Sequence, residues 1–280
     1  MEYSPKKMNS LLEEKSFNFK KKFGQNFITD ENIIDKIITM SKIDKDTLVI
    51  EIGPGAGSLT YKLVEKAKNV LCYEIDKELK PILESNIKKS ENLKIIYEDF
   101  LLCDVKSDIK DYKFDKLYVV SNLPYYITTP IITKLIEENI NVDKIIVMVQ
   151  KEVGDRFKAK PGSKDYSSIS VFLNYYYDIK KIMDVSKNVF MPKPNVDSIV
   201  IEFTKKKFIP KLIDEKFFFK FIKDCFKQKR KNIRNNLKEY NLEEIEFVLK
   251  KYNFDLNVRA EQLSLEIFID IANHLSSKYI

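Results

Sequence analysis

The segment Asn122–Tyr125 has the residue types needed to hold an aromatic amine for chemistry at its nitrogen. Such an amine is a poor nucleophile because its lone pair is delocalised into the ring. The side-chain oxygen of Asn122 and a backbone carbonyl such as that of Leu123 can accept both N–H groups, which draws the nitrogen toward tetrahedral geometry. Pro124 makes the turn and Tyr125 can stack on the ring. Turn chemistry with surface aromatics is the alternative interpretation.

Three of the six glycines in the chain, Gly53, Gly55 and Gly57, lie within five residues after an apolar run. Glycines that end a strand and open a helix permit positive φ and close backbone approach by a ligand. A plain strand-to-helix turn, the alternative, needs only one. The spacing partly fits a dinucleotide site, but Ser58 replaces the third glycine or alanine of that pattern. Glu51, just before the loop, suits a ligand that carries positive charge.

Acidic residues stand at the ends of the next two predicted strands. Glu74 is placed where a carboxylate can accept hydrogen bonds from both ribose hydroxyls. Asp99 can accept from an adenine amino group while Phe100 covers the ring. Surface solvation explains either acid alone, but three carboxylates, with Glu51, at successive strand ends indicate a ligand site. Asp76 is interpreted as a helix cap.

The string Val49–Gly57 resembles the first motif of S-adenosylmethionine-dependent methyltransferases. A sulfonium methyl group is already activated, so the protein need mainly position the reactants. The composition agrees, because His274 is the one histidine in the chain. Chemistry that needs a histidine base or several histidine ligands is therefore close to excluded.

The composition describes a globular protein of 280 residues, with 44% apolar and 32% charged residues. The apolar runs are far shorter than the about 20 residues of a membrane helix, and the N-terminal pattern does not support a secretory signal. Three widely spaced cysteines, Cys72, Cys103 and Cys225, argue against a disulfide framework or a thiolate metal site. We expect a cytoplasmic protein with no membrane and no metal partner.

Short β-branched runs alternate with helical patterns, which predicts crossover units and a doubly wound, mostly parallel sheet. Runs without internal alternation are typical of strands buried on both faces. We expect seven strands, at Leu48–Ile52, Val70–Ile75, Leu93–Tyr97, Leu117–Val120, Ile145–Val149, Asp178–Val185 and Ser198–Phe203. Helices are expected from a cap at Thr29 or Asp30 through Met40, and at Leu59–Ala67, Glu78–Lys88 and Thr129–Glu138.

The pattern becomes wholly helical from Asp214 onward, and a basic segment opens this part of the chain. Residues 205–240 carry 13 Lys or Arg against 4 Asp or Glu, in a chain whose net charge is +7. A polyanion partner and a solvated charge run are both open interpretations. In one continuous helix the basic residues would share a sector of about 100°, although Asn232, Asn235 and Asn236 could mark a break. We predict an N-terminal arm at 1–20, an α/β domain at 21–206 and a helical domain at 207–280.

Several motifs together resemble one family, the ribosomal RNA adenine N6-dimethyltransferases. The resemblance runs from about residue 20 to the C-terminus and is greatest to the small-subunit (16S rRNA, KsgA-type) branch. It is carried by the segments Lys22–Ile28, Val49–Gly57, Asn122–Pro130, Phe190–Ser198, Gln228–Leu237 and Arg259–Ser264. Tyr126 stands where Asn is common in the family, and Ile28 where Leu is common.

The resemblance implies a Rossmann-like class I methyltransferase fold with a small all-helical C-terminal domain. The implied activity is S-adenosylmethionine-dependent N6,N6-dimethylation of two adjacent adenosines near the 3′ end of 16S rRNA. The implied partner is the 30S subunit or its precursor, bound by a monomer with a role in subunit biogenesis.

The resemblance also implies residue roles. The cofactor residues would be Gln25, Asn26, Ile28, Glu51, Gly53, Gly55, Glu74, Ile75, Asp99, Phe100 and Asn122. The target base would be held by Asn122, Leu123, Pro124, Tyr125 and Phe190, and RNA by Lys223, Lys227, Arg230, Lys231 and Arg234.

Four alternatives stay open at this point. The first is a large-subunit (23S) rRNA adenine methyltransferase of the macrolide-resistance type. The second is a DNA adenine methyltransferase, although Asn-Leu-Pro-Tyr differs from the usual double-proline form. The others are a non-catalytic ribosome-assembly or transcription factor on the same scaffold and a nicotinamide oxidoreductase.

Overall fold

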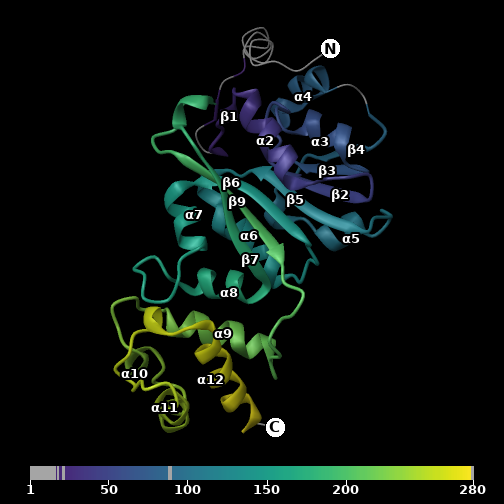
Figure 1. The fold of residues 1–280 in the computed structure, drawn as a ribbon. Helices are drawn as coiled ribbons and strands as arrows, with labels where there is room; N and C mark the ends of the chain where they lie inside the picture. The colour runs from purple at the N-terminus through teal and green to yellow at the C-terminus, as the bar shows by residue number, and fades with distance from the viewer. Residues whose placement is uncertain (1–16, 18, 21–22, 88–89, 279–280) are drawn as a thin grey trace. The chain divides into compact units, whose positions relative to one another are not determined.

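The computed structural model describes residues 17, 19–20, 23–87 and 90–278 (Figure 1). Most of the predicted arm at 1–20 therefore lies outside the described residues. A seven-stranded sheet has the order β4-β3-β2-β5-β6-β9-β7. Its strands are β2 (Thr47–Ile52), β3 (Asn69–Tyr73), β4 (Leu93–Ile96), β5 (Lys116–Asn122), β6 (Lys144–Gln150), β7 (Tyr177–Val185) and β9 (Ser198–Lys205).

The pairs β2–β3, β3–β4, β2–β5 and β5–β6 are parallel, and β6–β9 is antiparallel. The predicted doubly wound, mostly parallel sheet is thus confirmed. Every residue of β2 is buried, as expected for a central strand covered on both faces. In a separate two-stranded sheet, β1 (Phe27–Ile28) pairs antiparallel with β8 (Phe190–Met191).

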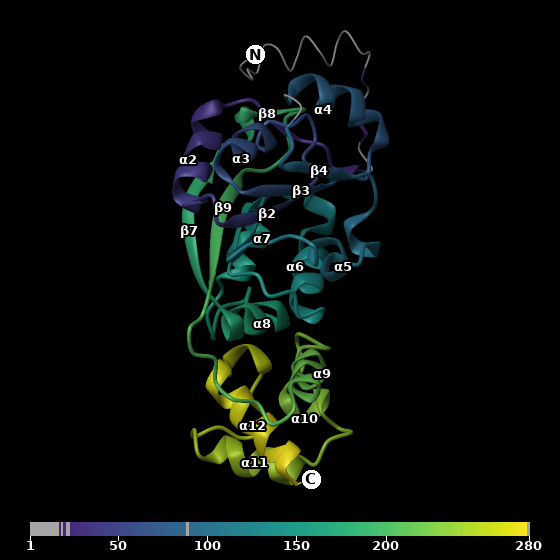
Figure 2. The same ribbon diagram turned by 90° about the vertical axis from the view of Figure 1, so that its right-hand side faces the viewer.

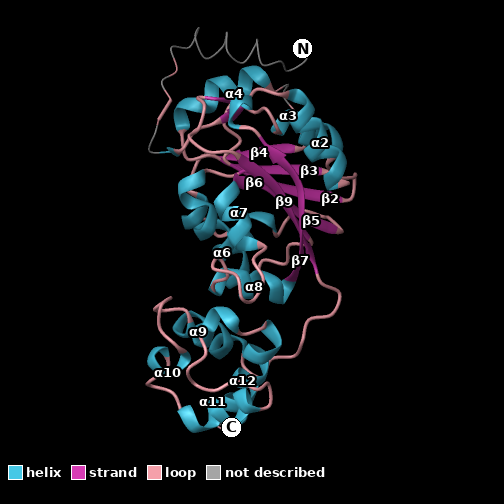
Figure 3. Cartoon of the chain, turned by 60° about the vertical axis from the view of Figure 1, so that its left-hand side comes forward, coloured by secondary structure: helices cyan, strands magenta, loops and turns pink. Residues whose placement is uncertain are grey.

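Helices cover both faces of the sheet. Figure 2 shows α2, α3 and α4 on one side of the sheet and α5 and α6 on the other, and Figure 3 shows α6 on the side opposite α2, α3 and α4. The helices that follow the strands are α2 (Glu31–Ser41), α3 (Thr60–Lys66), α4 (Lys80–Asn86), α5 (Val105–Ile109), α6 (Thr128–Glu137) and α7 (Lys151–Phe157). Short 3-10 helices are η2 (Lys77–Leu79), η3 (Phe100–Leu102), η4 (Tyr125–Ile127), η5 (Lys187–Val189) and η6 (Ala260–Gln262).

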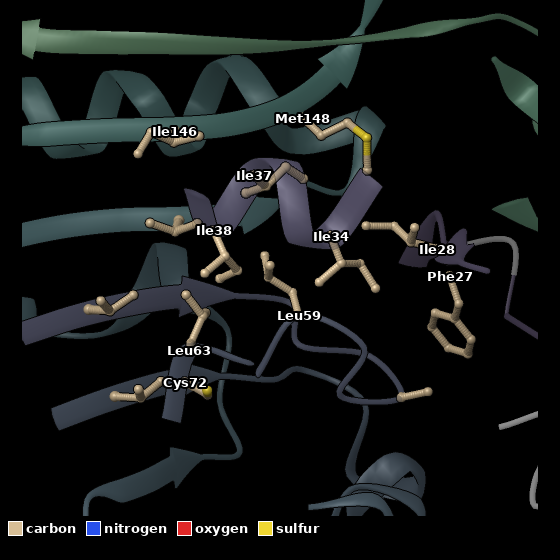
Figure 4. Close-up of a cluster of buried hydrophobic side chains, with 14 of the residues drawn as sticks. Phe27, Ile28, Ile34, Ile37, Ile38, Leu59, Leu63, Cys72, Ile146 and Met148 are labelled. Atoms are coloured by element: carbon tan, nitrogen blue, oxygen red, sulfur yellow. The ribbon is translucent and has the colours of Figure 1, made fainter. Parts of the chain in front are cut away.

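Helix α2 shows how the sequence builds this layer. The Asp30 side chain accepts a hydrogen bond from the Asn32 backbone N–H (2.9 Å), so Asp30 is the cap. Ile34, Ile37 and Ile38 recur at helical spacing and are buried. They meet Leu59, Leu63 and apolar side chains of the sheet in one hydrophobic cluster (Figure 4).

By its internal contacts the chain divides into two compact units, residues 1–154 with 180–204, and residues 155–179 with 205–280. The second unit contains α8 (Ser168–Tyr176), α9 (Glu215–Cys225), α10 (Ile233–Asn236), α11 (Leu242–Lys250) and α12 (Leu265–Ser277). This grouping differs from the predicted limits in assigning 155–179 to the helical part. Aromatic packing of α8 on α9 accounts for it, with Phe172 and Phe219 centroids 4.7 Å apart. The domain limits themselves stay a prediction.

The basic segment does not form one continuous helix, so that expectation is wrong. Helix α9 ends at Cys225 and α10 begins at Ile233. The Asn236 side chain donates to the carbonyl of Cys225 (2.7 Å), and the Asn232 side chain caps α10. Asparagine amides thus satisfy backbone groups on both sides of the break, because helix ends leave such groups unpaired. Within the described residues, no helix has the length and apolar character to cross a membrane.

Candidate active site

One cavity lies at the carboxyl ends of the parallel strands β2, β3 and β5, where open α/β sheets bind ligands. Of the residues predicted to bind the cofactor or the target base, two are not among its lining. Ile28 and Phe190 are instead buried and face each other across the β1–β8 pair. The predicted residues that line the cavity are Gln25, Asn26, Glu51, Gly53, Gly55, Glu74, Ile75, Asp99, Phe100, Asn122, Leu123, Pro124 and Tyr125.

The glycine loop after β2 needs glycine at its first two positions. Gly53 and Gly55 have φ values of 71° and 59°, which L side chains rarely adopt. A Cβ on Gly55 would lie 2.7 Å from the ring of Phe27. The loop is therefore pressed against the β1 segment, and its backbone is open to a ligand from the cavity side.

Glu74 is buried at the end of β3 and is tied to this loop. One carboxylate oxygen accepts from the backbone N–H of Gly55 (3.0 Å) and the other from that of Asp76 (2.9 Å). Each oxygen keeps a second lone pair for a further donor. Burial raises the pKa of Glu74 to about 7. Donors from a bound ligand would favour the ionised carboxylate and offset this cost.

Glu51 is a second buried acid, on β2, with 2% of its surface exposed. Burial raises the pKa of Glu51 to about 8, and the nearby Glu74 charge contributes to the same upward shift. The thiol of Cys72 donates to its carboxylate at 3.5 Å. A positively charged ligand in the cavity would stabilise the ionised form, so the site favours a cation next to the glycine loop.

Asp99 and Phe100 lie where the chain leaves β4. Asp99 caps η3 by accepting from the Leu101 N–H (2.9 Å), which leaves its second oxygen available. Phe100 packs edge-on against Tyr73, with ring centroids 5.1 Å apart. This fixes an apolar wall beside a hydrogen-bond acceptor, an arrangement suited to a flat heterocycle with an amino group.

Asn122 has an unusual arrangement of its amide. The Nδ2 group donates to the backbone carbonyl of Asn26 (2.8 Å), which also fixes which end of the amide is nitrogen. Its Oδ1 is buried and has no hydrogen-bond partner among the described residues. A buried acceptor without a donor is costly and rare, so this oxygen is suited to take an N–H from a ligand.

The turn that follows is held by its own backbone and by β9. The Leu123 N–H donates to the carbonyl of Met148 (3.1 Å), and the Pro124 carbonyl accepts from Ile127 and Thr128. The Tyr125 hydroxyl lies 2.6 Å from the hydroxyl of Ser198. Burial raises the pKa of Tyr125, and the bond to Ser198 holds this side chain in the cavity lining.

Several lining residues and their partners were not predicted. Asp76 does cap η2, but its buried carboxylate also binds the side chains of Lys20 (2.8 Å) and Gln25 (2.7 Å). No local sequence signal could indicate partners more than 50 positions away. Gly24 could have been noticed as a glycine in the segment Lys22–Ile28. Its φ is 57°, and the absence of a Cβ lets the Tyr126 ring approach closely.

The predicted RNA-binding residues all belong to the helical unit and are exposed. They stand on α9, on the turn after it and on α10: Lys223, Lys227, Arg230, Lys231 and Arg234. Among the described residues, no group of three or more His, Cys, Asp or Glu side chains is arranged to hold a metal ion.

The family model and the similar known proteins all indicate the same family. Residues 16–277 match the family described as ribosomal RNA adenine dimethylase. A "Ribosomal RNA small subunit methyltransferase A" from Staphylococcus haemolyticus is 44% identical over 274 residues, covering 95% of this chain and 93% of that protein. A protein of the same name from Bacillus licheniformis is 44% identical over 283 residues, covering 97% and 96%.

Solved structures agree at the level of the fold. A dimethyladenosine transferase from Plasmodium falciparum aligns with a TM-score of 0.75 and 25% identity, covering 91% of this chain and 98% of that one. The 23S rRNA methyltransferase ErmE aligns with a TM-score of 0.68 and 22% identity, covering 89% and 99%. At these coverages the likeness extends over most of the chain rather than over the sheet alone.

Proposed function

The chain belongs to the ribosomal RNA adenine dimethylase family, and from that premise we propose that it dimethylates adenosines of small-subunit rRNA at N6, using S-adenosylmethionine. The full-length relatives at about 44% identity are named for the small subunit. The large-subunit alternative is not favoured, because its solved example shares the fold at only 22% identity.

The residues of the cavity fit this cofactor. S-adenosylmethionine supplies, when bound, a methyl group activated by a positively charged sulfur. Glu51 and the backbone at Gly53 and Gly55 would hold its charged methionine end. Glu74 would accept from the ribose hydroxyls, and Asp99 with Phe100 would bind the adenine. The buried acids support this, because they are costly without a cationic, donor-rich ligand.

The single observation that carries the proposal is the buried, unpartnered Oδ1 of Asn122. It would accept one N–H of the target adenine, and the carbonyl of Leu123 would accept the other. Two acceptors on one amine favour a pyramidal nitrogen, whose lone pair would then be free to attack the sulfonium methyl group. The N–CH₃ bond would form as the S–CH₃ bond breaks, which leaves a neutral thioether, and the proton lost from N6 would pass to water. The ring of Tyr125 would stack on the base and hold it, and Phe190 is proposed on its other side by resemblance alone.

The exposed basic residues of the helical unit would bind the rRNA backbone, with a marked salt dependence. We further propose that the substrate is the 30S subunit or its precursor, that the target is two adjacent adenosines near the 3′ end of 16S rRNA, and that the protein acts as a monomer. An enzyme with this substrate would work in the cytoplasm and contribute to subunit biogenesis.

The test is mass spectrometry of rRNA after incubation of purified 30S and 50S subunits, unmodified at N6, with the protein and cofactor. We expect N6,N6-dimethyladenosine in the 30S sample alone. Asn122→Ala should retain cofactor binding yet transfer no methyl group, while the exposed control Asn257→Ala stays active. Binding to 30S without any transfer would favour the assembly-factor alternative, and transfer only to 50S would favour the large-subunit enzyme.

A further inference from the structure

Asp76 is a buried carboxylate that directly follows the cavity-lining residues Glu74 and Ile75, and it has more hydrogen-bond partners than a helix cap requires. Only 2% of its surface is exposed. Capping of η2 uses one oxygen, which accepts from the Glu78 N–H (3.2 Å) and also binds the Lys20 ammonium (2.8 Å). The other oxygen accepts from Nε2 of Gln25 at 2.7 Å. Buried acids are rare unless they are paired in this way.

The residue that follows Gln25 is joined to the opposite wall of the cavity. The carbonyl of Asn26 accepts the Nδ2 group of Asn122 at 2.8 Å. Gln25 is further oriented by its own Oε1, which accepts from the Lys20 backbone N–H (2.8 Å). Two successive residues of one segment thus connect Asp76, which follows β3, to Asn122, which ends β5.

The connection matters because a carboxamide can present either of two opposite groups. Turned one way, Asn122 offers its oxygen to an incoming amine. Turned by 180°, it offers an NH₂ group, which repels the N–H groups of that amine. Among the described residues, the bond to the Asn26 carbonyl is the contact that selects the first orientation.

We propose that Asp76 is a positioning residue that, through Gln25 and the Asn26 carbonyl, keeps the side-chain oxygen of Asn122 turned toward the reacting amine. This inference rests on the proposed function, because it assigns a role in setting up the same acceptor. It also joins the proposed ribose-binding acid to the target site, since the Asp76 N–H donates to Glu74 (2.9 Å).

The donor and acceptor directions allow a sharp test. In Asp76→Asn the new amide can take two orientations. In one its NH₂ group faces the NH₂ group of Gln25, and in the other it faces the Glu78 N–H and the Lys20 ammonium. Both orientations place a donor against a donor. In Gln25→Glu the new carboxylate faces the carboxylate of Asp76. In the double variant the amide introduced at position 76 can donate to the carboxylate introduced at position 25, which restores a bond of reversed direction at the wild-type net charge.

The experiment measures single-turnover methyl transfer to 30S subunits at saturating cofactor and RNA, together with the KM for RNA and the melting temperature. We expect each single variant to slow transfer by about tenfold or more, with an unchanged KM for RNA. The double variant should recover most of the wild-type rate. Asp104→Asn keeps a helix cap on α5, and Asp104 does not line the cavity, so this variant is the control and should transfer at the wild-type rate.

The inference is overturned if Asp76→Asn transfers as fast as the wild type, or if the double variant is no faster than the slower single one. Should Asp76→Asn not fold, the comparison of Gln25→Glu with the double variant decides the same question. A further control tests whether a weaker ion pair of Lys20 is enough to slow transfer. Glu78→Gln removes the exposed carboxylate that lies 2.9 Å from the Lys20 ammonium, and it should leave the rate unchanged. An inactive wild type would refute the proposed function instead.

Discussion

Glu51 and Glu74 are two carboxyl groups buried within one small cavity, and burial raises the pKa of both. Proteins seldom bury acids without a partner. Here the cost is concentrated where a cationic, hydroxyl-rich cofactor is proposed to bind. Without cofactor, burial therefore disfavours the ionised forms of Glu51 and Glu74. Cofactor binding should then be linked to the release of protons from these carboxyl groups.

This linkage predicts how the stability of the cofactor-free protein depends on pH. In the folded state Glu51 titrates near pH 8, while in the unfolded chain it titrates at its ordinary value near 4.5. Between these two pH values the folded state holds a proton on Glu51 that the unfolded chain has lost. The contribution of Glu51 to the free energy of unfolding is therefore complete below about pH 4.5 and falls as pH rises toward 8. We expect a loss of about 2 kcal/mol or more between pH 5 and 8, measured by urea unfolding.

Glu51→Gln should make that slope shallower, because the amide has no proton to lose, and Glu74, whose pKa burial raises to about 7, should account for the slope that remains. The exposed control Glu239→Gln should keep the wild-type slope. A Glu51→Gln curve parallel to that of the wild type would show that burial does not shift this acid.

Tyr125 and Ser198 supply a second test at single residues. Their hydroxyls lie 2.6 Å apart, and Ser198 is completely buried at the start of β9. Ser198→Ala should slow methyl transfer several-fold by freeing the Tyr125 ring, and Tyr125→Phe should act similarly because it breaks the same bond. The double variant should be no slower than either single one, since both remove one interaction. Additive losses in single-turnover rates would refute the coupling.

The glycine loop joins strand β2 to helix α3, and its conformation can be tested by substitution. Gly55→Ala places a methyl group at positive φ and against the Phe27 ring, whereas Gly162→Ala meets positive φ with no atom within 4 Å. Both should lose about 1 kcal/mol of stability from the backbone. Only Gly55→Ala should weaken cofactor binding, by about tenfold or more, as measured by calorimetry. Equal affinities for the two variants would argue against the loop as the binding element.

The elements also show what the sequence could and could not predict. Alternating strands and helices, the glycine loop and the cap at Asp30 were predictable because each depends on neighbouring residues. The β1–β8 pair joins two-residue strands from distant parts of the chain, so no local pattern encodes it. The bonds from Asp76 to Gln25 and from Asn122 to Asn26 likewise depend on the tertiary fold. The break after Cys225 was foreseeable only as a possibility, because the basic periodicity continues across it while Asn232, Asn235 and Asn236 indicate an interruption.

At the scale of the whole molecule, the two compact units have separate roles in the proposed function. The cavity belongs entirely to the first unit, while the exposed basic residues after α9 belong to the second. Cofactor binding and RNA affinity should therefore be separable by mutation.

Arg230→Gln with Lys231→Gln tests this division. RNA affinity should fall, and the slope of log affinity against log salt should decrease by roughly one for each phosphate contact removed. Cofactor affinity should not change. Lys36→Gln, an exposed change on α2, is the control. An unaltered salt slope would remove these two residues from the RNA interface, and weaker cofactor binding would contradict the separation.

The chain enters the helical unit twice, first at 155–179 and again from 205. A protein shortened at residue 206 would keep α8 but lose α9, against which Phe172 and Tyr175 pack, and the Pro210 carbonyl that accepts from the Tyr175 hydroxyl. The aromatic side chains of α8 that pack against α9 would then be exposed to solvent, and this fragment would be prone to aggregate. A minimal catalytic fragment would therefore require α8 to be redesigned with a polar outer face, in addition to removal of the tail.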